Sequence, residues 1–388
     1  MPVEKVKQNS ALIERVEQFL QTGYTANEDF NSDFSGNAPV VINSLKELGQ
    51  EYLYDASELL YWVDRETYFD ELDCWSGGKV KEEHSEAIDF LNASNQQAVF
   101  SDLIELIRRQ RVAPFIGAGV SKAADYPLWG EALEYLGKNI AALDEVEVKQ
   151  LISENKYLEA AQKVVDASEY QLINYVQTTF RTRYDSDKER EAIPTLFKLL
   201  PRLSNGCIIT TNFDCLIEEA FRAEKAPLVD GYMHGVQQGH NFVQRLLKGD
   251  RCVLKLHGDA SQPGTYVFTE EQYKTAYGDG VIDYSNQLPK ALRQIYISNS
   301  LLFLGCSLAH DKTLELFKEV KDGCQFEIPD HFAIISEPET IAVKQATEDR
   351  LLDIKIRPIW YKSDNHHVMA TKLVELAVDI AERRLSLG

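Results

Sequence analysis

The fold is decided at one stretch of the chain, Val112-Ala113-Pro114-Phe115-Ile116-Gly117-Ala118-Gly119-Val120-Ser121. Its apolar half predicts a buried strand, and its glycines predict a tight turn directly after it. Ser121 is expected at a helix N-cap, where a side chain satisfies free backbone N–H groups. Such a turn can approach a pyrophosphate closely. The third glycine of the dinucleotide fingerprint is absent, so a bare tight turn is the alternative interpretation.

Further along the chain, strands alternate with helices. Short apolar runs occupy residues 207–211, 252–256, 301–304, 332–335 and 354–360, and amphipathic, helix-length segments separate most of them. This alternation predicts an α/β fold, a Rossmann-like doubly wound parallel sheet with helices on both faces. Right-handed crossovers would then place the carboxyl ends of all strands at one edge, where such folds bind ligands.

The chain outside the strands is predicted to be helical. Residues 1–98 are expected to form a helical N-terminal extension for packing or oligomerisation, interrupted at 25–36 and 75–79. Residues 99–388 are expected to form the Rossmann-like domain. Because residues 130–200 contain helical pattern and no convincing strand, we expect a helical insertion lobe there.

Composition excludes several classes of function. The 388 residues include 41 Lys and Arg and 61 Asp and Glu, so the formal charge is −20. Such a chain binds nucleic acid or anionic membranes poorly, and the small cluster Arg108, Arg109 and Arg111 is expected to face solvent at a helix C-terminus. The sequence has neither an apolar signal core nor a run of about 20 apolar residues, which predicts a cytoplasmic protein without a membrane span.

The six cysteines form no C-x-x-C pair and are too few for a disulfide framework. They are Cys74, Cys207, Cys215, Cys252, Cys306 and Cys324. Since most of them lie in apolar runs, we expect buried, reduced thiols and no zinc ribbon.

Three other predicted strands also end in small or polar residues. Thr210-Thr211-Asn212-Phe213-Asp214 follows one strand, His257-Gly258-Asp259 another, and Gly305-Cys306-Ser307 a third. Each has a structural alternative. Asn212 or Asp214 could cap the following helix, His257 could be a core histidine, and Gly305 could mark an ordinary strand terminus.

Taken together and in this order, the four strand ends resemble the sirtuin (silent information regulator) superfamily. The resemblance covers roughly residues 111–311. The matching pieces are Gly117-Ala118-Gly119-Val120-Ser121, Thr211-Asn212-Phe213-Asp214, Lys255-Leu256-His257-Gly258 and Gly305-Cys306-Ser307. Each motif is short, but their joint order and spacing are specific.

Departures from the pattern indicate one branch of that superfamily. Protein-deacylating sirtuins carry a zinc ribbon of two cysteine pairs after the histidine strand, and here the cysteines are single. Pro127-Leu128-Trp129 instead resembles the Pro-x-Trp of bacterial sirtuin-like NAD-consuming proteins of antiphage defence, as does Gly305-Cys306-Ser307-Leu308 with Asp311 and Thr313. Because only an amphipathic helix over 368–384 follows Trp360, the chain looks like a stand-alone effector subunit that pairs with a HerA-type DNA-translocating ATPase.

The resemblance implies an NAD glycohydrolase that releases nicotinamide and ADP-ribose and needs no metal. Asn212 would hold the ribose and position water, His257 would be the general base, and Asp214 would orient Asn212 or the nicotinamide amide. The residues implied to contact NAD are Gly117, Ala118, Gly119, Ser121, Thr211, Gly258, Gly305 and Ser307. Such an effector would deplete NAD on infection, and homo-oligomer assembly or its partner would restrain it until then.

Two other functions stay open on the sequence alone. A protein deacylase would need an acyl-peptide groove and normally the zinc ribbon, and neither is visible. A non-catalytic subunit of a DNA-processing complex could sense NAD or ADP-ribose, although the presence of both Asn212 and His257 argues against it.

Overall fold

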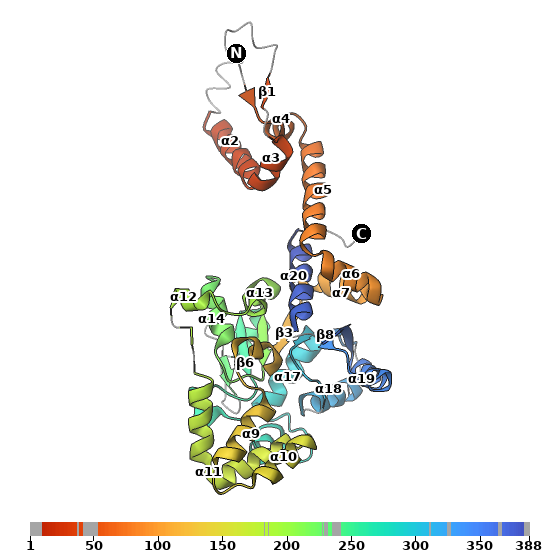
Figure 1. Ribbon diagram of the computed structural model, residues 1–388. Coiled ribbons are helices and arrows are strands. Elements are labelled where there is room, and N and C mark those ends of the chain that lie inside the picture. The colour runs from red at the N-terminus through yellow and green to blue at the C-terminus, as the bar shows by residue number, and fades with distance from the viewer. Residues whose placement is uncertain are drawn as a thin grey trace. The chain divides into compact units, whose positions relative to one another are not determined.

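The computed structural model describes residues 10–36, 39–41, 53–181, 183–184, 186–226, 228, 232–234, 242–309, 312–323, 327–363 and 367–383. The chain forms two compact units, Met1–Ser85 and Glu86–Gly388 (Figure 1). Helix α7 (Gln97–Arg108) lies in the second unit and packs against α20 (Val368–Arg383). The domain boundary at 98/99 remains a prediction.

The first unit contains α2 (Ser10–Thr25), α3 (Glu28–Ser35), β1 (Val40–Val41), β2 (Leu53–Tyr54), α4 (Ala56–Val63) and α5 (Arg65–Glu83). Aromatic rings form its core, with Tyr68 edge-on to Phe30 at 5.2 Å and to Tyr61 at 4.9 Å between ring centroids. The predicted interruption at 75–79 is wrong, and that at 25–36 is confirmed in part, at Ala26 and Asn27, the turn between α2 and α3. Residues 28–35 form α3, and residues 75–79 lie inside α5, where Trp75 packs on the core.

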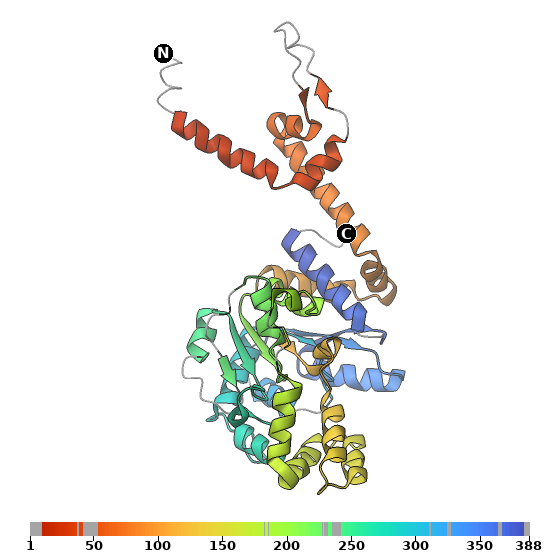
Figure 2. The ribbon, with the colours of Figure 1, turned by 60° about the vertical axis from the view of Figure 1, so that its left-hand side comes forward.

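The second unit is built on a seven-stranded parallel sheet, counted over the described residues, in the order β5-β6-β4-β3-β7-β8-β9. Figure 2 shows the sheet among the surrounding helices. The strands are β3 (Val112–Ile116), β4 (Cys207–Thr210), β5 (Tyr232–His234), β6 (Cys252–Lys255), β7 (Ser300–Leu304), β8 (His331–Ser336) and β9 (Ile356–Tyr361). The predicted fold class is confirmed. The edge strand β5 was not predicted, because three residues are too few to produce a recognisable pattern.

Helices cover both faces of this sheet. The core on one face joins Phe115 and Phe303, whose rings are 4.8 Å apart, to α17 (Gln287–Ser298) and α18 (Lys312–Gly323). On the other side α7, α13 (Thr195–Leu203), α14 (Leu216–Ala223) and α20 pack on one another. Apart from the helices between β3 and α13, the other α-helices among the described residues are α6 (Ser85–Ser94), α15 (Phe242–Lys248), α16 (Glu270–Tyr277) and α19 (Ile341–Asp353).

The predicted helical insertion separates β3 from β4. It begins with α8 (Ala118–Ser121), and α9 (Trp129–Asn139), α10 (Glu145–Ser153) and α11 (Tyr157–Thr179) pack together as a lobe, followed by α12 (Asp187–Arg190). Helix α13 differs from the prediction, because it packs against β3 and α14 and so belongs to the layer on the sheet.

The burial of the cysteine side chains depends on where they lie in the fold. Cys207 and Cys252 are buried register partners on β4 and β6, whereas Cys74 is exposed, and Cys324 lies outside the described residues. The predicted basic cluster ends α7, where Arg108 and Arg109 both pair with Glu105. Among the described helices none is both long and apolar enough to cross a bilayer.

Candidate functional site

The glycine turn after β3 is in direct contact with the turn after β7. Gly117 N–H donates to the Leu304 carbonyl at 2.9 Å, and Gly119 N–H donates to the Gly305 carbonyl at 3.0 Å. A Cβ on Gly117 would lie 2.4 Å from the Gly305 oxygen, and Gly305 itself has φ +66°. The glycines are therefore required for the two turns to approach each other.

This contact lies where the strand order reverses. On one side of β3 the sheet continues with β4, β6 and β5, and on the other side with β7, β8 and β9, to which the chain returns after β6. Ligands of doubly wound sheets bind at the carboxyl ends of the strands beside such a point. A cavity of about 270 Å³ opens here, and its lining includes Gly119, Gly305, Leu196 and Val368.

Asn212, Ser121 and Asp214 form one buried hydrogen-bonded chain. Asn212 Nδ2 donates to the Gly117 carbonyl at 3.2 Å and to Ser121 Oγ at 2.8 Å, and Ser121 Oγ donates to Asp214 Oδ2 at 2.8 Å. A backbone carbonyl only accepts, so these bonds fix which end of the carboxamide faces the glycine turn. Asn212 Oδ1 accepts only a longer bond, from Thr211 Oγ1 at 3.3 Å.

Two expectations about helix caps change here. The N-cap of α8 is Gly117, and Ser121 stands at the N-cap position of the short 3-10 helix Lys122–Ala124 without a capping bond from its side chain. The expected side-chain cap is therefore wrong, and the Ser121 hydroxyl instead links two loops. The structural alternative for Asp214 is confirmed, because its Oδ1 accepts from the N–H of Leu216, the first residue of α14. Burial raises the pKa of Asp214, although the bonds from Ser121 and Leu216 oppose that rise.

His257 follows β6, the neighbour of β4. Gly258 has φ +97°, and a Cβ there would lie 2.5 Å from the Thr265 carbonyl oxygen, so glycine permits the sharp departure expected at this point. The imidazole is buried, and its Nε2 lies 2.7 Å from the hydroxyl of Tyr273 on α16. Trp129, singled out by the sequence, begins α9 and places its ring 6.1 Å from that of His257.

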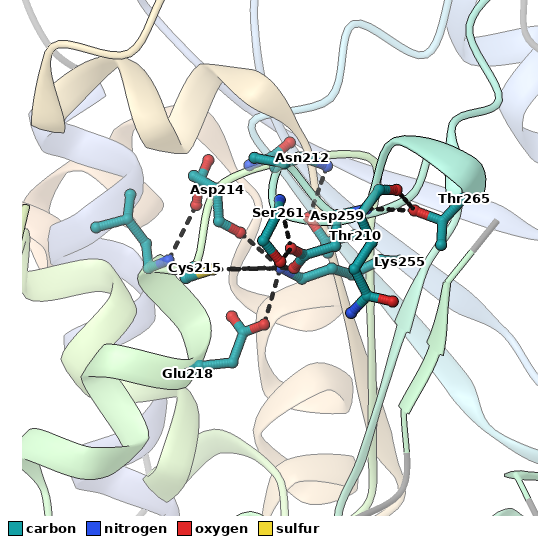
Figure 3. A network of polar contacts seen from close by, with 12 residues as sticks. Thr210, Asn212, Asp214, Cys215, Glu218, Lys255, Asp259, Ser261 and Thr265 are labelled. Carbon is teal, nitrogen blue, oxygen red and sulfur yellow. Dashed lines mark hydrogen bonds and ion pairs between the residues drawn. The ribbon is translucent and has the colours of Figure 1, made fainter. Parts of the chain in front are cut away.

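Lys255, at the end of β6, is fully buried and joins the two loops (Figure 3). Its Nζ lies 2.8 Å from the Asp214 carbonyl oxygen, 2.6 Å from Asp259 Oδ2 and 2.8 Å from Glu218 Oε1. Burial alone would lower the pKa of Lys255, but the neighbouring acidic groups raise it above the ordinary value. No role was predicted for Lys255, although a lysine in the otherwise apolar run 252–256 is a signal of a buried charged contact.

The same cluster contains groups that could ligate a cation. Cys215 Sγ and carboxylate oxygens of Glu218 and Asp259 lie within 4.8 Å of one another. The Lys255 ammonium lies among them, 3.9 Å from Cys215 Sγ, and already supplies a positive charge. Burial raises the pKa of the Cys215 thiol to about 12, so the thiol is protonated at neutral pH.

The remaining predicted residues lie along the same edge of the sheet. Thr211 continues β4 and donates its N–H to the Ile116 carbonyl at 3.2 Å, and Ala118 begins α8. Ser307 is exposed after β7, and Asp311 lies outside the described residues. The structure thus joins Gly117, Ser121, Asn212 and Asp214 in one network, while His257 is held separately by Tyr273.

The chain is similar to known proteins over part of its length. Residues 206–359 match the SIR2-like domain family. Relatives named NAD(+) hydrolase ThsA occur in Bacillus cereus, 24% identical over 61% of this chain and 46% of the relative, and in Acinetobacter baumannii, 28% identical over 55% and 39%. A third, from Enterococcus faecium, is 25% identical over 56% of this chain and 41% of the relative. The chain therefore spans less than half the length of these curated relatives.

Proposed function

We propose that this chain, whose residues 206–359 match the SIR2-like domain family, is an NAD glycohydrolase, which hydrolyses NAD to nicotinamide and ADP-ribose. The names of its three relatives support this reaction class. The observation that carries the proposal is the orientation of the Asn212 carboxamide. Both hydrogens of Nδ2 are used by Gly117 and Ser121, so Oδ1 is the end that can accept a hydrogen bond from a ribose hydroxyl or from water.

NAD would lie along the carboxyl edge of β3 and β7. The cavity beside Gly119 and Gly305 is lined mostly by apolar atoms, some of them from α13 and α20, which suits an adenosine group. Gly117, Ala118 and Gly119 would follow the pyrophosphate. Ser121 would contribute through its backbone, because its hydroxyl is bonded to Asn212 and Asp214. Thr211, Gly258 and Ser307 would border the rest of the dinucleotide.

Hydrolysis requires that water replace nicotinamide on the ribose. The glycosidic C–N bond breaks through an oxocarbenium-like state, its electron pair neutralises the departing pyridinium nitrogen, and the oxygen of water bonds to the ribose carbon. Asn212 Oδ1 would position that water. His257 would contact a ribose hydroxyl and accept the proton that water loses, with Asp214 orienting Asn212 through Ser121.

The wider role is part of the same proposal. A protein that hydrolyses NAD would serve as an antiphage effector by depleting the cytoplasmic pool on infection, and it would need restraint before then. Homo-oligomer assembly or a HerA-type ATPase would supply the restraint, with the first unit as a gate. Deleting residues 1–91 tests this role, since unchanged activity and unchanged assembly state would remove the gate from the proposal.

The decisive experiment measures nicotinamide release from NAD by the purified protein, alone and with a HerA-type ATPase and DNA, with EDTA added to test metal independence. Asn212→Ala and His257→Ala should abolish release, whereas Asn139→Ala, on an exposed part of α9, should not. An acyl-lysine peptide in parallel reactions would reveal a deacylase. If the protein neither binds NAD by calorimetry nor releases nicotinamide under any of these conditions, the proposal is wrong.

A further inference from the structure

The Lys255 ammonium contacts both loops of the proposed site at equivalent positions along the chain. One of its oxygen acceptors is the carbonyl of Asp214, two residues after Asn212, and another is the carboxylate of Asp259, two residues after His257. The two strands that lead into these loops are direct neighbours, with Thr210 opposite Lys255 in the register. Lys255 therefore spans from the carboxamide loop to the imidazole loop (Figure 3).

Each N–H donor of the Lys255 ammonium has an oxygen acceptor. An ammonium has three N–H donors, and three oxygens surround Lys255 Nζ within 2.8 Å: Asp214 O, Asp259 Oδ2 and Glu218 Oε1. Burial opposes ionisation of Asp259, yet the ammonium and the donors of Ser261 hold the pKa of this carboxyl below its usual range. A buried ion pair of this kind tolerates little displacement of either partner.

Asp259 is held from its own side as well. Its Oδ1 accepts from the backbone N–H of Ser261 at 2.9 Å and from Ser261 Oγ, and its N–H donates to Thr265 Oγ1 at 3.0 Å. The imidazole loop is therefore rigid around the carboxylate that meets Lys255. Any movement of Asp259 relative to Lys255 would carry the backbone of His257 with it.

We propose that Lys255 is a positioning residue, which sets the distance between Asn212 and His257 by tying the Asp214 carbonyl to the Asp259 carboxylate. The inference rests on the proposed function, because it assigns a purpose to the bridge between the two residues placed in that reaction. Glu218, on α14, completes the charge balance but belongs to neither loop.

Two matched substitutions test the inference. Asp259→Asn and Glu218→Gln each remove one carboxylate partner of the same buried ammonium, at 2.6 Å and 2.8 Å, and both should lower the melting temperature. Only Asp259→Asn should lower kcat for nicotinamide release, by about 100-fold, because misplacement of catalytic groups by about 1 Å costs that much. KM for NAD should change little, since Lys255 contacts no part of the proposed binding cavity.

The outcomes separate the two proposals. A wild-type protein that neither binds NAD nor releases nicotinamide, alone or with the HerA-type ATPase and DNA, contradicts the proposed function. Wild-type activity together with equal kcat in the two variants, or a loss in each that follows its melting temperature, overturns the positioning role alone. If Asp259→Asn does not fold, Ser261→Ala replaces it. This variant keeps the ion pair and the backbone bond from Ser261 N–H to Asp259 Oδ1 but removes the hydroxyl bond to the same oxygen. Because one of the bonds that hold Asp259 is lost, kcat should fall about tenfold, and an unchanged kcat would contradict the positioning role.

Discussion

The hydroxyl oxygen of Tyr273 lies 2.7 Å from Nε2 of His257, although 16 residues separate them along the chain. Tyr273 reaches this position from α16, whose N-terminus is fixed by a capping box between Thr269 and Gln272. The phenol therefore holds one edge of the imidazole, and with it the orientation of the ring that we propose as general base.

Tyr273→Phe removes that bond and leaves the ring in place. We expect kcat for nicotinamide release to fall about tenfold, equivalent to the loss of one hydrogen bond, and the pH profile of kcat to shift because the imidazole loses a polar partner. Tyr277→Phe is the control, one turn along the same helix with its ring 5.5 Å from that of Tyr273. Equal kinetics in the two variants would show that the contact has no part in the reaction.

Ser121→Ala interrupts the chain between Asn212 and Asp214. The variant leaves one hydrogen of Asn212 Nδ2 and one oxygen of Asp214 without the serine, and both are buried. We expect the free energy of unfolding to fall by about 1–3 kcal/mol and kcat to fall as the carboxamide loses its orientation. Denaturant unfolding and nicotinamide release measure the two effects, with Ser153→Ala on the exposed face of α10 as control. Normal kcat at reduced stability would limit Ser121 to a structural role.

Gly117→Ala tests the contact between the turns after β3 and β7. The added methyl group would lie 2.4 Å from the Gly305 oxygen and 2.8 Å from Cys306 Sγ, so the turns must separate. Overpacking of this kind costs about 1–3 kcal/mol, and NAD binding measured by calorimetry should weaken as well. Gly264→Ala adds the same methyl group where no atom lies within 4 Å and should change neither quantity. A Gly117→Ala protein with wild-type stability would show that the turns are not tightly packed.

The strands of the central sheet could be predicted because they are buried on both faces. Residues of β3 and β7 are all buried, and a strand of that kind appears in the sequence as an unbroken apolar run. Polar residues directly after such runs then indicate the carboxyl edge of the sheet. Asn212 and His257 were predicted as site residues for this reason. The interruption predicted at 75–79 failed for the opposite reason, because packing of Trp75 keeps α5 helical through two glycines.

The partners of the site residues could not be predicted in the same way. Tyr273 meets His257, and Glu218 meets Lys255, only because α16 and α14 pack beside the strand ends. No spacing along the chain encodes those contacts. The glycine turn illustrates a related difficulty, since Gly117 was considered for its approach to a pyrophosphate, whereas the structure gives it a second purpose in its approach to Gly305.

The glycines inside α5 provide a prediction about stability. Gly77 and Gly78 lie within the helix with no atom in 4 Å of an added Cβ. Gly77→Ala and Gly78→Ala should therefore each raise the stability of the first unit by about 0.5–1 kcal/mol, because alanine loses less backbone entropy on entering a helix. Thermal unfolding monitored through Trp62 and Trp75 fluorescence would measure the change. Destabilisation by either substitution would indicate that the glycine itself is needed at that position.

His331 on β8 predicts a dependence of stability on pH. Its Nδ1 accepts from the Leu301 N–H at 3.0 Å, and burial lowers the pKa of the imidazole from 6.5 to about 3. The unfolded chain therefore binds a proton below about pH 6.5 that the folded protein does not bind until about pH 3. The contribution of His331 to the free energy of unfolding is therefore complete above the pKa that this side chain has in the unfolded protein. It decreases as the pH falls, and about 2 kcal/mol is lost at pH 5. His331→Asn keeps an acceptor for Leu301 but does not titrate, so its free energy of unfolding should fall less than that of the wild type between pH 7.5 and pH 5. Equal losses in the two proteins would assign the pH dependence to other groups.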